Sequence, residues 1–471
     1  MLDNFWEHVD QYRKLGFDPL RWIPTCSNEV DPVILRSALA EVKRASIKVS
    51  PSWFDPFYHI DGKPPELTRR IYDLANPVID KEVEVKRALS IFRIHTGAGE
   101  YAPLLSEALQ NFFKAFSAKV SVLSATATLT EHPEAQFAMF DYIELHRGDK
   151  VGYMPAVTSA TQVIDITRAP DADTHSSIAM TSAIENLNLL GCGVSSSFKL
   201  FPVYDAPSEE ILDRIRANLD AFTSRYNLAM EDYSSLKTNK LFYGTSAVAI
   251  TNKELPTRYD QVEEGMEIMI TNKFGGLPAV SLYTLGRMDS ENIIKYEQNG
   301  VSYEGIVAAK DEAIKSLSEP HFVLGKIVAK YCPDFGSPFD KNTHITAVYP
   351  VGPRGVFALG SLAELANSRL AISELPVRNE EMARFATKEF LVENSTASVN
   401  GCNLIVATRD VLNLVAEDLK KHNFAPETIG SVGGKGAPVV AFAKDAGQFV
   451  ASKAKLARLT SPVQQQQPPA G

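Results

Sequence analysis

Polar side chains gather in one otherwise apolar segment of this chain, residues 182–191. Glu185, Asn186 and Asn188 lie there among apolar residues that recur at helical spacing, and Gly191 ends the pattern as a helix C-cap does. A buried helix that carries a carboxylate and two amides is unusual, because each polar group needs a partner. Such groups cap or bridge neighbouring backbone groups, and the pattern alone favours that structural role.

The composition is that of a globular protein and excludes several functional classes. The 471 residues suffice for two or three domains, and 45% of them are hydrophobic while 22% are charged. A net charge of −9 without a long basic run argues against nucleic acid as the main partner. No apolar run reaches membrane-spanning length and no leader pattern is visible, so we expect a cytoplasmic protein without a membrane partner. The cysteines are too far apart for a disulfide framework or an ordinary zinc site, which favours a reducing compartment: Cys26, Cys192, Cys332 and Cys402.

The apolar patterns predict a mixed chain of helices and strands. Residues 1–90 are predicted to be mostly helical, and strands then alternate with helices in the same order twice, which indicates two related α+β units around a polar linker at 252–261. The glutamine- and proline-rich end is predicted to be disordered. The predicted strands include 150–157, 160–167, 199–203, 240–250 and 266–271, and the predicted helices include 104–116, 177–190, 209–226, 304–317, 323–331 and 409–421.

A glycine-rich stretch at 431–436 is similar at first sight to a phosphate-binding loop. It lacks the spacing and the terminal Ser or Thr of a P-loop, and a strand pattern with Pro438 at its entry follows instead of a helix. We therefore predict a β-hairpin turn at this position.

Several short motifs follow one another in an order that is typical of one protein family. They are His95-Thr96-Gly97-Ala98-Gly99 before Pro103, Ala138-Met139-Phe140-Asp141, Ile164-Asp165-Ile166-Thr167, the segment 182–191, Gly265–Gly275, His344–Gly360 and Val399–Ile405. From about His95 to Phe442 the chain resembles selenophosphate synthetases (selenide, water dikinases). More distantly it resembles the aminoimidazole ribonucleotide synthetase superfamily to which they belong. The order of the motifs carries the resemblance, because no single motif is decisive.

The resemblance implies a magnesium site built from acidic side chains. Asp141 and Asp165 match two of the family's metal-binding aspartates, whereas Asn186 and Tyr349 stand where two others are expected. Glu185, Asp171 and Asp173 are nearby in the sequence and would supply carboxylates after a register shift. An amide oxygen ligates a cation without neutralising it, so each replacement is expected to weaken the binding of a magnesium–triphosphate complex.

The resemblance also implies ATP as a cofactor, bound together with magnesium. Gly97, Gly99, Ser182 and Lys273 fall at nucleotide-binding positions of the family. In the family a mobile glycine-rich segment carries a Cys or selenocysteine and a Lys, which act on selenide and on the nucleotide phosphates. Here residues 100–102 are Glu, Tyr and Ala, so the glycines are present while the thiolate chemistry is not.

The architecture implied by the resemblance is a two-domain aminoimidazole ribonucleotide synthetase-like α+β fold with an N-terminal helical extension. The extension spans 1–94, the N-terminal domain with its half-barrel of strands spans 95–252, and the C-terminal domain spans 255–447. A disordered tail covers 448–471. Half-barrels from two subunits form one barrel in the family, so a homodimer is implied.

Three functional hypotheses are compatible with these residues. In the first, the chain is a degenerate selenophosphate-synthetase-like protein, a pseudoenzyme that binds nucleotide in an unconventional way or acts as a scaffold. In the second, it is an active ATP-dependent phosphotransferase on another small substrate, with Asp141, Asp165 and Glu185 holding the metal. In the third, it is a non-enzymatic subunit of a larger assembly, and residues 1–94 dock a protein partner. We rank the first hypothesis above the second.

Overall fold

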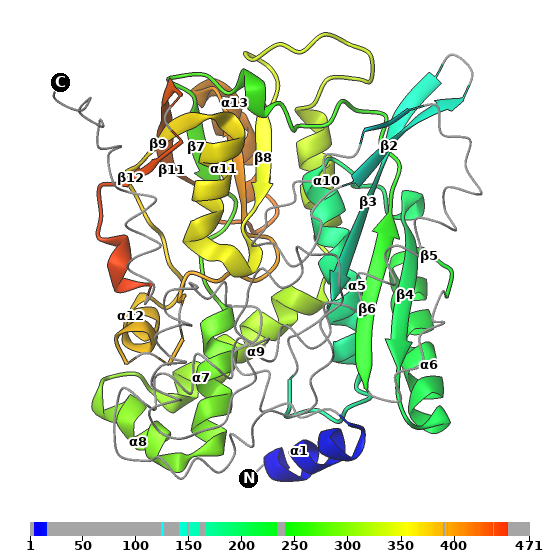
Figure 1. Cartoon of the computed structure of the whole chain (residues 1–471), viewed down its shortest axis with the longest axis vertical. Helices are drawn as coiled ribbons and strands as arrows, with labels where there is room; N and C mark the ends of the chain where they lie inside the picture. Colours follow the sequence, from blue (N-terminus) through cyan, green and yellow to red (C-terminus); the bar gives the residue numbers. More distant parts are fainter. Residues whose placement is uncertain are drawn as a thin grey trace, which may run out of the picture.

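Two six-stranded β-sheets form the framework of the molecule, with helices packed on both (Figure 1). The structure is a computed structural model that describes residues 4–16, 124–126, 141–147, 150–160, 165–232, 241–389, 391–392, 394–436 and 438–450. The mixed α+β architecture predicted from the sequence is confirmed.

Most helices of the described chain are amphipathic and cover a sheet face or one another. In the helix 209–226, for example, Leu212, Ile215, Leu219 and Phe222 lie on one buried stripe, and the left-handed Asn227 ends the helix. The helices are α1 (Phe5–Lys14), α5 (Asp173–Leu189), α6 (Glu209–Tyr226), α7 (Leu277–Met288), α8 (Ser290–Gln298), α9 (Tyr303–Ser318), α10 (Phe322–Lys330), α11 (Ala358–Ala366), α12 (Glu380–Lys388) and α13 (Arg409–Lys420), with short 3-10 turns at Ser195–Ser197, Tyr259–Gln261, Gly352–Phe357 and Ala446–Gln448.

The first sheet has the strand order β1-β2-β3-β6-β4-β5. Neighbouring strands run antiparallel, except that β5 pairs with β4 in parallel. Leu200 and Tyr204 of β4 and Ala247 of β6 belong to the buried core that this sheet shares with α1, α5 and α6. The strands are β1 (Ser124–Thr126), β2 (Asp141–Arg147), β3 (Lys150–Ala160), β4 (Lys199–Asp205), β5 (Ala229–Met230) and β6 (Phe242–Val248).

The second sheet has the strand order β12-β9-β11-β7-β10-β8, and only the β12–β9 pair is parallel. Side chains alternate between its faces. Ile268 and Ile270 pack in the core that contains α11, whereas Met269 packs in the core that contains α10 and α13. Because both faces are covered, the central strands read as continuous apolar runs in the sequence. The strands are β7 (Glu267–Ile270), β8 (Ala347–Pro350), β9 (Ser368–Ile372), β10 (Asn403–Ala407), β11 (Glu427–Lys435) and β12 (Val440–Phe442).

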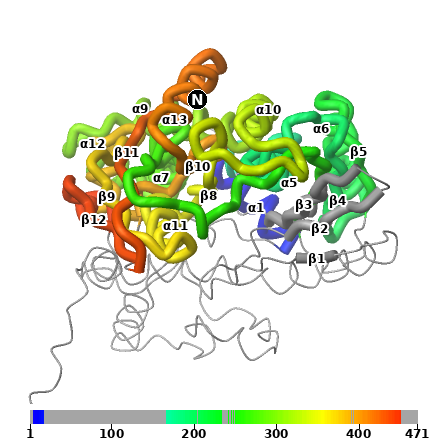
Figure 2. The backbone as a smooth tube through the Cα atoms, turned by 90° about the horizontal axis from the view of Figure 1, so that it is seen from above, coloured from blue at the N-terminus to red at the C-terminus, as the bar shows by residue number. Residues whose placement is uncertain are grey.

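Helix α5 joins the two halves of the molecule. It packs on β3, β6 and α6 on one side and on α9, α10 and β8 on the other, and Figure 2 shows it between the first sheet and α10. Twelve of its seventeen residues are buried, among them five polar ones. A helix that is covered all round has no polar face, which explains its weak amphipathic pattern. The helix predicted at 177–190 is confirmed and begins earlier, at Asp173.

The backbone of the loop after α5 packs directly against the backbone of α10. A Cβ added to Gly193 would lie 2.2 Å from the amide nitrogen of Lys326, and one added to Gly325 would lie 2.3 Å from the carbonyl oxygen of Cys192. Real Cβ atoms do not approach other atoms so closely, so both positions need glycine for lack of space.

Two predicted elements differ from the structure. Ile166 and Thr167 lie in a turn, so the strand predicted at 160–167 does not extend to its predicted end, and residues 161–164 lie outside the described chain. The hairpin turn predicted at 431–436 is also wrong, because β11 continues to Lys435. Strands β11 and β12 do not pair with each other, since β9 lies between them. At Gly430, just before the predicted turn, an added Cβ would lie 2.1 Å from the carbonyl oxygen of Ala371, so this glycine permits the close approach of β11 and β9.

At the two ends, only part of the predicted elements lies within the described chain. The helical prediction for the N-terminus is confirmed for α1, whereas the helix predicted at 104–116 lies outside the described residues. Near the C-terminus, Phe449 and Val450 are fully buried in the second sheet's core, so packed chain continues past the boundary placed at residue 447.

Candidate functional site

Asp165 lies at the start of a tight turn that leads into α5. Its carboxylate is buried, with 5% of the residue exposed. Oδ1 accepts hydrogen bonds from the backbone N–H of Thr167 at 3.0 Å and from the Thr167 hydroxyl at 2.5 Å. This is an Asx-type turn, in which an aspartate satisfies the backbone two residues further along the chain. The other oxygen, Oδ2, faces Lys310.

Lys310 brings a positive charge to Asp165 from the middle of α9. Its Nζ lies 3.6 Å from Asp165 Oδ2 and 2.7 Å from Asp311 Oδ1, and 4.8 Å from the ring centroid of Tyr283. Lys310 is 4% exposed, and among the described residues it is the only buried lysine. A buried ammonium requires compensating charges, and here two carboxylates and an aromatic face provide them.

Helix α1 closes the other side of the turn at Asp165. His8 Nδ1 donates to the carbonyl of Ile166 at 3.0 Å. The Tyr12 hydroxyl lies 2.6 Å from His175 Nε2 and 3.2 Å from the carbonyl oxygen of Arg168. Burial lowers the pKa of His175 to about 4, although the nearby charge of Asp165 acts in the opposite direction. His175 is therefore a neutral imidazole at pH 7.

Glu185 projects from the other end of α5 toward α10. Its Oε1 accepts from the backbone N–H of His321 at 2.6 Å, which caps the N-terminus of α10, and from Asn188 Nδ2 at 3.3 Å. Its Oε2 lies 3.1 Å from His321 Nδ1, an electrostatic contact without the alignment of a hydrogen bond. The charge of Glu185 raises the pKa of His321 above its usual range.

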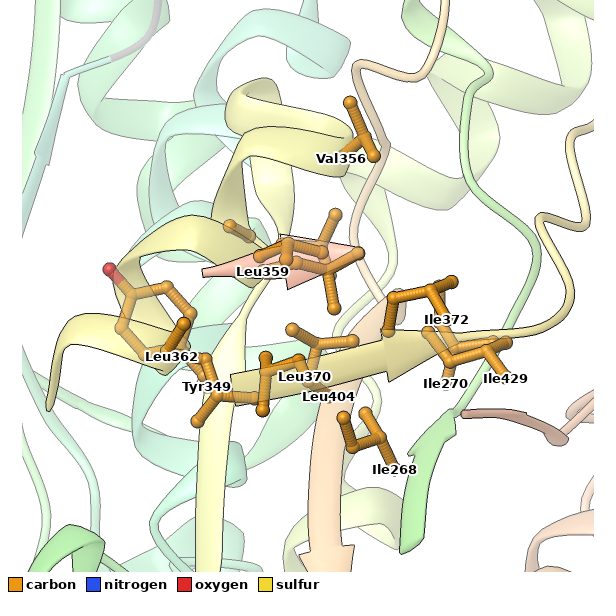
Figure 3. Close-up of a cluster of buried hydrophobic side chains, with 14 of the residues drawn as sticks. Ile268, Ile270, Tyr349, Val356, Leu359, Leu362, Leu370, Ile372, Leu404 and Ile429 are labelled. Carbon is orange, nitrogen blue, oxygen red and sulfur yellow. The ribbon is translucent and has the colours of Figure 1, made fainter. Parts of the chain in front are cut away.

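Tyr349 lies in the hydrophobic core of the second sheet, on β8. It is 2% exposed, and Figure 3 shows its ring beside Leu362 of α11, with the hydroxyl oxygen at the edge of the apolar cluster. Arg354 Nη1 donates to that hydroxyl at 2.5 Å. Both side chains are buried, so the phenol and the guanidinium satisfy each other inside the protein.

The remaining predicted residues that the structure describes lie on α5 and after β7. Ser182 donates to the carbonyl of Ile178 within its own helix at 2.8 Å. Asn186 is half-buried on α5, and Lys273 is exposed after β7. The helix start that follows Lys273 is occupied by protein, because the Leu277 N–H points at the carbonyl oxygen of Ala397, 3.4 Å away.

Three residues of the predicted site fall wholly or partly outside what the structure describes. Gly97 and Gly99 lie outside the described residues. Asp141 begins β2, where its backbone pairs with Ala156, and its side chain is likewise outside what the structure describes.

The acidic positions that the structure does describe are thus separated. Asp165 contacts Lys310, in the middle of α9, whereas Glu185 contacts His321, at the start of α10. More than two helical turns of α9 separate Lys310 from the end of that helix, and His321 follows beyond it. Tyr349 lies on β8, in the core of the second sheet. In the part of the chain that the structure describes, no group of three or more His, Cys, Asp or Glu side chains is arranged to hold a metal ion.

Sequence reasoning overlooked the basic partners of these residues. Lys310 falls in step with Ile306, Ala313 and Leu317, the buried face of α9. A lysine at an apolar position of an amphipathic helix is a usable signal of a buried charge. No comparable signal marks His321, because its partner Glu185 is 136 residues away in the sequence.

The comparisons with known proteins find similar solved structures. A thiamine-monophosphate kinase from Stenotrophomonas maltophilia K279a is 13% identical, with a TM-score of 0.44 over 72% of this chain and 96% of that one. The hydrogenase maturation protein HypE is 15% identical, with a TM-score of 0.44 over 69% and 93%. The thiamine monophosphate kinase from Aquifex aeolicus is 13% identical, with a TM-score of 0.42 over 72% and 97%. No family model and no curated protein sequence matches the chain. Within the described residues, no helix is long and apolar enough to span a bilayer.

Proposed function

We propose that this chain is a degenerate relative of selenophosphate synthetases that does not carry out magnesium-dependent phosphoryl transfer. On this proposal it binds nucleotide without a metal or serves as a scaffold. One observation carries it: the buried side chain of Asp165, which the resemblance assigns to magnesium, is already paired with Lys310 of the same chain.

The chemistry of the reaction explains why this pairing matters. Phosphoryl transfer from ATP depends on magnesium to neutralise the charge that spreads over the phosphate oxygens. Magnesium prefers an octahedron of hard oxygen ligands, with carboxylates supplying the negative charge. In this chain Lys310 neutralises Asp165 and His321 faces Glu185. The described residues therefore do not fit a magnesium ion at these positions.

ATP is the nucleotide to test, because the sequence motifs imply it. We expect calorimetric titration with ATP or a non-hydrolysable analogue to give the same affinity with and without magnesium. We also expect no ATP turnover, with or without selenide. Turnover that requires magnesium and is lost in Asp165→Asn would overturn the proposal. The matched control is Asp334→Asn, since Asp334 is an exposed carboxylate that pairs with Lys253 at 2.6 Å.

A scaffold role, if it uses the N-terminal extension, has to rely on residues other than the apolar face of α1. Phe5, Val9 and Tyr12 are fully buried against the chain's own core, whereas Trp6 is half exposed. The proposal includes a homodimer, which the family resemblance implies. Light scattering of the purified chain tests it, and a monomer at micromolar concentration would remove the dimer from the proposal.

A further inference from the structure

The ammonium of Lys310 lies between two carboxylates. The arrangement resembles a cation site in which a lysine of the protein is the cation. We propose that the Lys310 ammonium takes the place of a divalent cation between Asp165 and Asp311, so that the native chain is closed to metal here. On this view, removing the ammonium opens a divalent-cation site. The inference extends the proposed function, and its test involves no nucleotide.

The oxygens around Lys310 are of the right chemical class. Asp165 Oδ2 and Asp311 Oδ1 both lie within 4 Å of the same nitrogen, at 3.6 Å and 2.7 Å. The Thr167 hydroxyl is bound to the other oxygen of Asp165, which fixes the orientation of that carboxylate. Carboxylate oxygens are the ligands that magnesium, manganese and calcium select.

Burial separates this pair from the other lysine–carboxylate contacts of the described chain. The side chains of Lys310 and Asp165 are 5% and 6% exposed, whereas Lys253 is 25% exposed and its partner Asp334 is 71% exposed. Surface pairs are solvated and lose little when one member is removed. A buried carboxylate that loses its partner must recruit another cation or a proton, because water does not neutralise it.

The geometry also offers a route and room for a cation in a truncated variant. The side chain of Asp311 is 65% exposed, so one ligand reaches solvent. Truncation of Lys310 to alanine removes its ammonium and most of its aliphatic chain, which leaves space for an ion that keeps several of its own waters, as magnesium does.

The test is a thermal-unfolding titration of four proteins with magnesium and manganese chloride at constant ionic strength. We expect Lys310→Ala to gain several degrees of melting temperature at about 10 mM cation, as linkage requires for a ligand that binds only the folded state. We expect no gain in the native protein, in Asp165→Asn/Lys310→Ala, or in Lys253→Ala, the matched surface control. Equal responses of all four proteins would overturn the proposal, as would no response in Lys310→Ala.

Manganese binding to the native protein, measured by electron paramagnetic resonance, covers the case in which Lys310→Ala does not fold. We expect no tight manganese binding by the native protein. We expect Asp165→Asn/Lys310→Met, which removes both charges, to fold and to show no change in melting temperature with the cation. Tight manganese binding by the native protein that Asp165→Asn abolishes would overturn the proposal. Nucleotide binding or its absence does not alter any of these outcomes. A missing response of Lys310→Ala overturns this inference and leaves the proposed function, whereas tight manganese binding of the native protein through Asp165 overturns both.

Discussion

Single carboxylates in this chain organise structure at positions where the sequence points to metal binding. Glu185 is the best example, because its two oxygens serve the N-terminus of α10, the ring of His321 and the amide of Asn188. A carboxylate at a helix N-terminus is favoured by the free N–H groups there and by the helix dipole. The bridging role that the helical pattern favoured is therefore the one that the structure describes.

Glu185→Gln keeps the shape of the side chain and removes its charge. We expect a loss of about 1–3 kcal/mol in the free energy of unfolding, because a buried hydrogen-bonding network loses its ionic member. Urea denaturation followed by circular dichroism measures it. Glu312→Gln is the control, since Glu312 pairs with Arg378 at the surface and is 68% exposed. For this control we expect a change below about 1 kcal/mol. Equal losses in the two variants would contradict the prediction.

His175 predicts a specific pH dependence of stability. Burial lowers the pKa of His175 to about 4, below the value of about 6.5 in an unfolded chain. Between these two values the unfolded state binds a proton that the folded state does not, so the contribution of the neutral imidazole is complete above pH 6.5 and is lost as the pH falls toward 4. We expect the stability difference between the native protein and His175→Gln to shrink over this window. A constant difference from pH 7 to pH 4 would show that His175 does not titrate as described.

At the scale of elements, the position of α10 depends on two glycines that let its backbone contact the loop after α5. The contact between Gly193 and α10 leaves no space for a methyl group on either side. Close backbone approach lets a short helix dock firmly on a loop, at the cost of tolerance to substitution.

Gly325→Ala is expected to destabilise the protein by more than about 3 kcal/mol or to prevent folding, because the new Cβ would overlap the carbonyl of Cys192. The melting temperature and the soluble yield measure the effect. The control is Gly434→Ala in β11, where the nearest atom to an added Cβ is Glu264 Oε2 at 4.0 Å. A Gly325→Ala protein as stable as this control would contradict the packing described here.

The sequence predicts an element well where a single helical or strand periodicity dominates. It predicts an element poorly where contacts with backbone far away in the sequence determine the local structure. α6 was predicted to the residue at both ends, because its apolar stripe and its acidic first turn are local signals. The turn prediction for 431–436 is wrong because the glycines there suggest a turn locally, whereas this segment pairs as part of β11 with β9, a strand that no local pattern reveals. The partners within the candidate site were missed for the same reason: Glu185 and His321 are 136 residues apart in the sequence.

At the scale of the whole molecule, the two sheets share one central helix. Leu189 of α5 belongs to the core of the second sheet, while Ile184 of the same helix belongs to the core of the first. An element common to two cores transmits the loss of one to the other.

We expect scanning calorimetry to show a single unfolding transition whose calorimetric and van't Hoff enthalpies agree. Two separated transitions would show that the halves unfold independently, against the role described for α5. As a check on the same point, hydrogen exchange of the α5 amides should have the protection of the global transition rather than that of a local opening.

The docking of α1 also has a consequence for biosynthesis. His8 and the carbonyl of Ile166 that it contacts are 158 residues apart. At translation rates of about 5–20 residues per second, the ribosome needs on the order of 10–30 s to deliver the second partner after the first. During that interval the partners that the structure describes for Phe5, Val9 and Tyr12, from residue 166 onward, have not yet been synthesised, so this apolar face docks there only after most of the first half of the chain has been made.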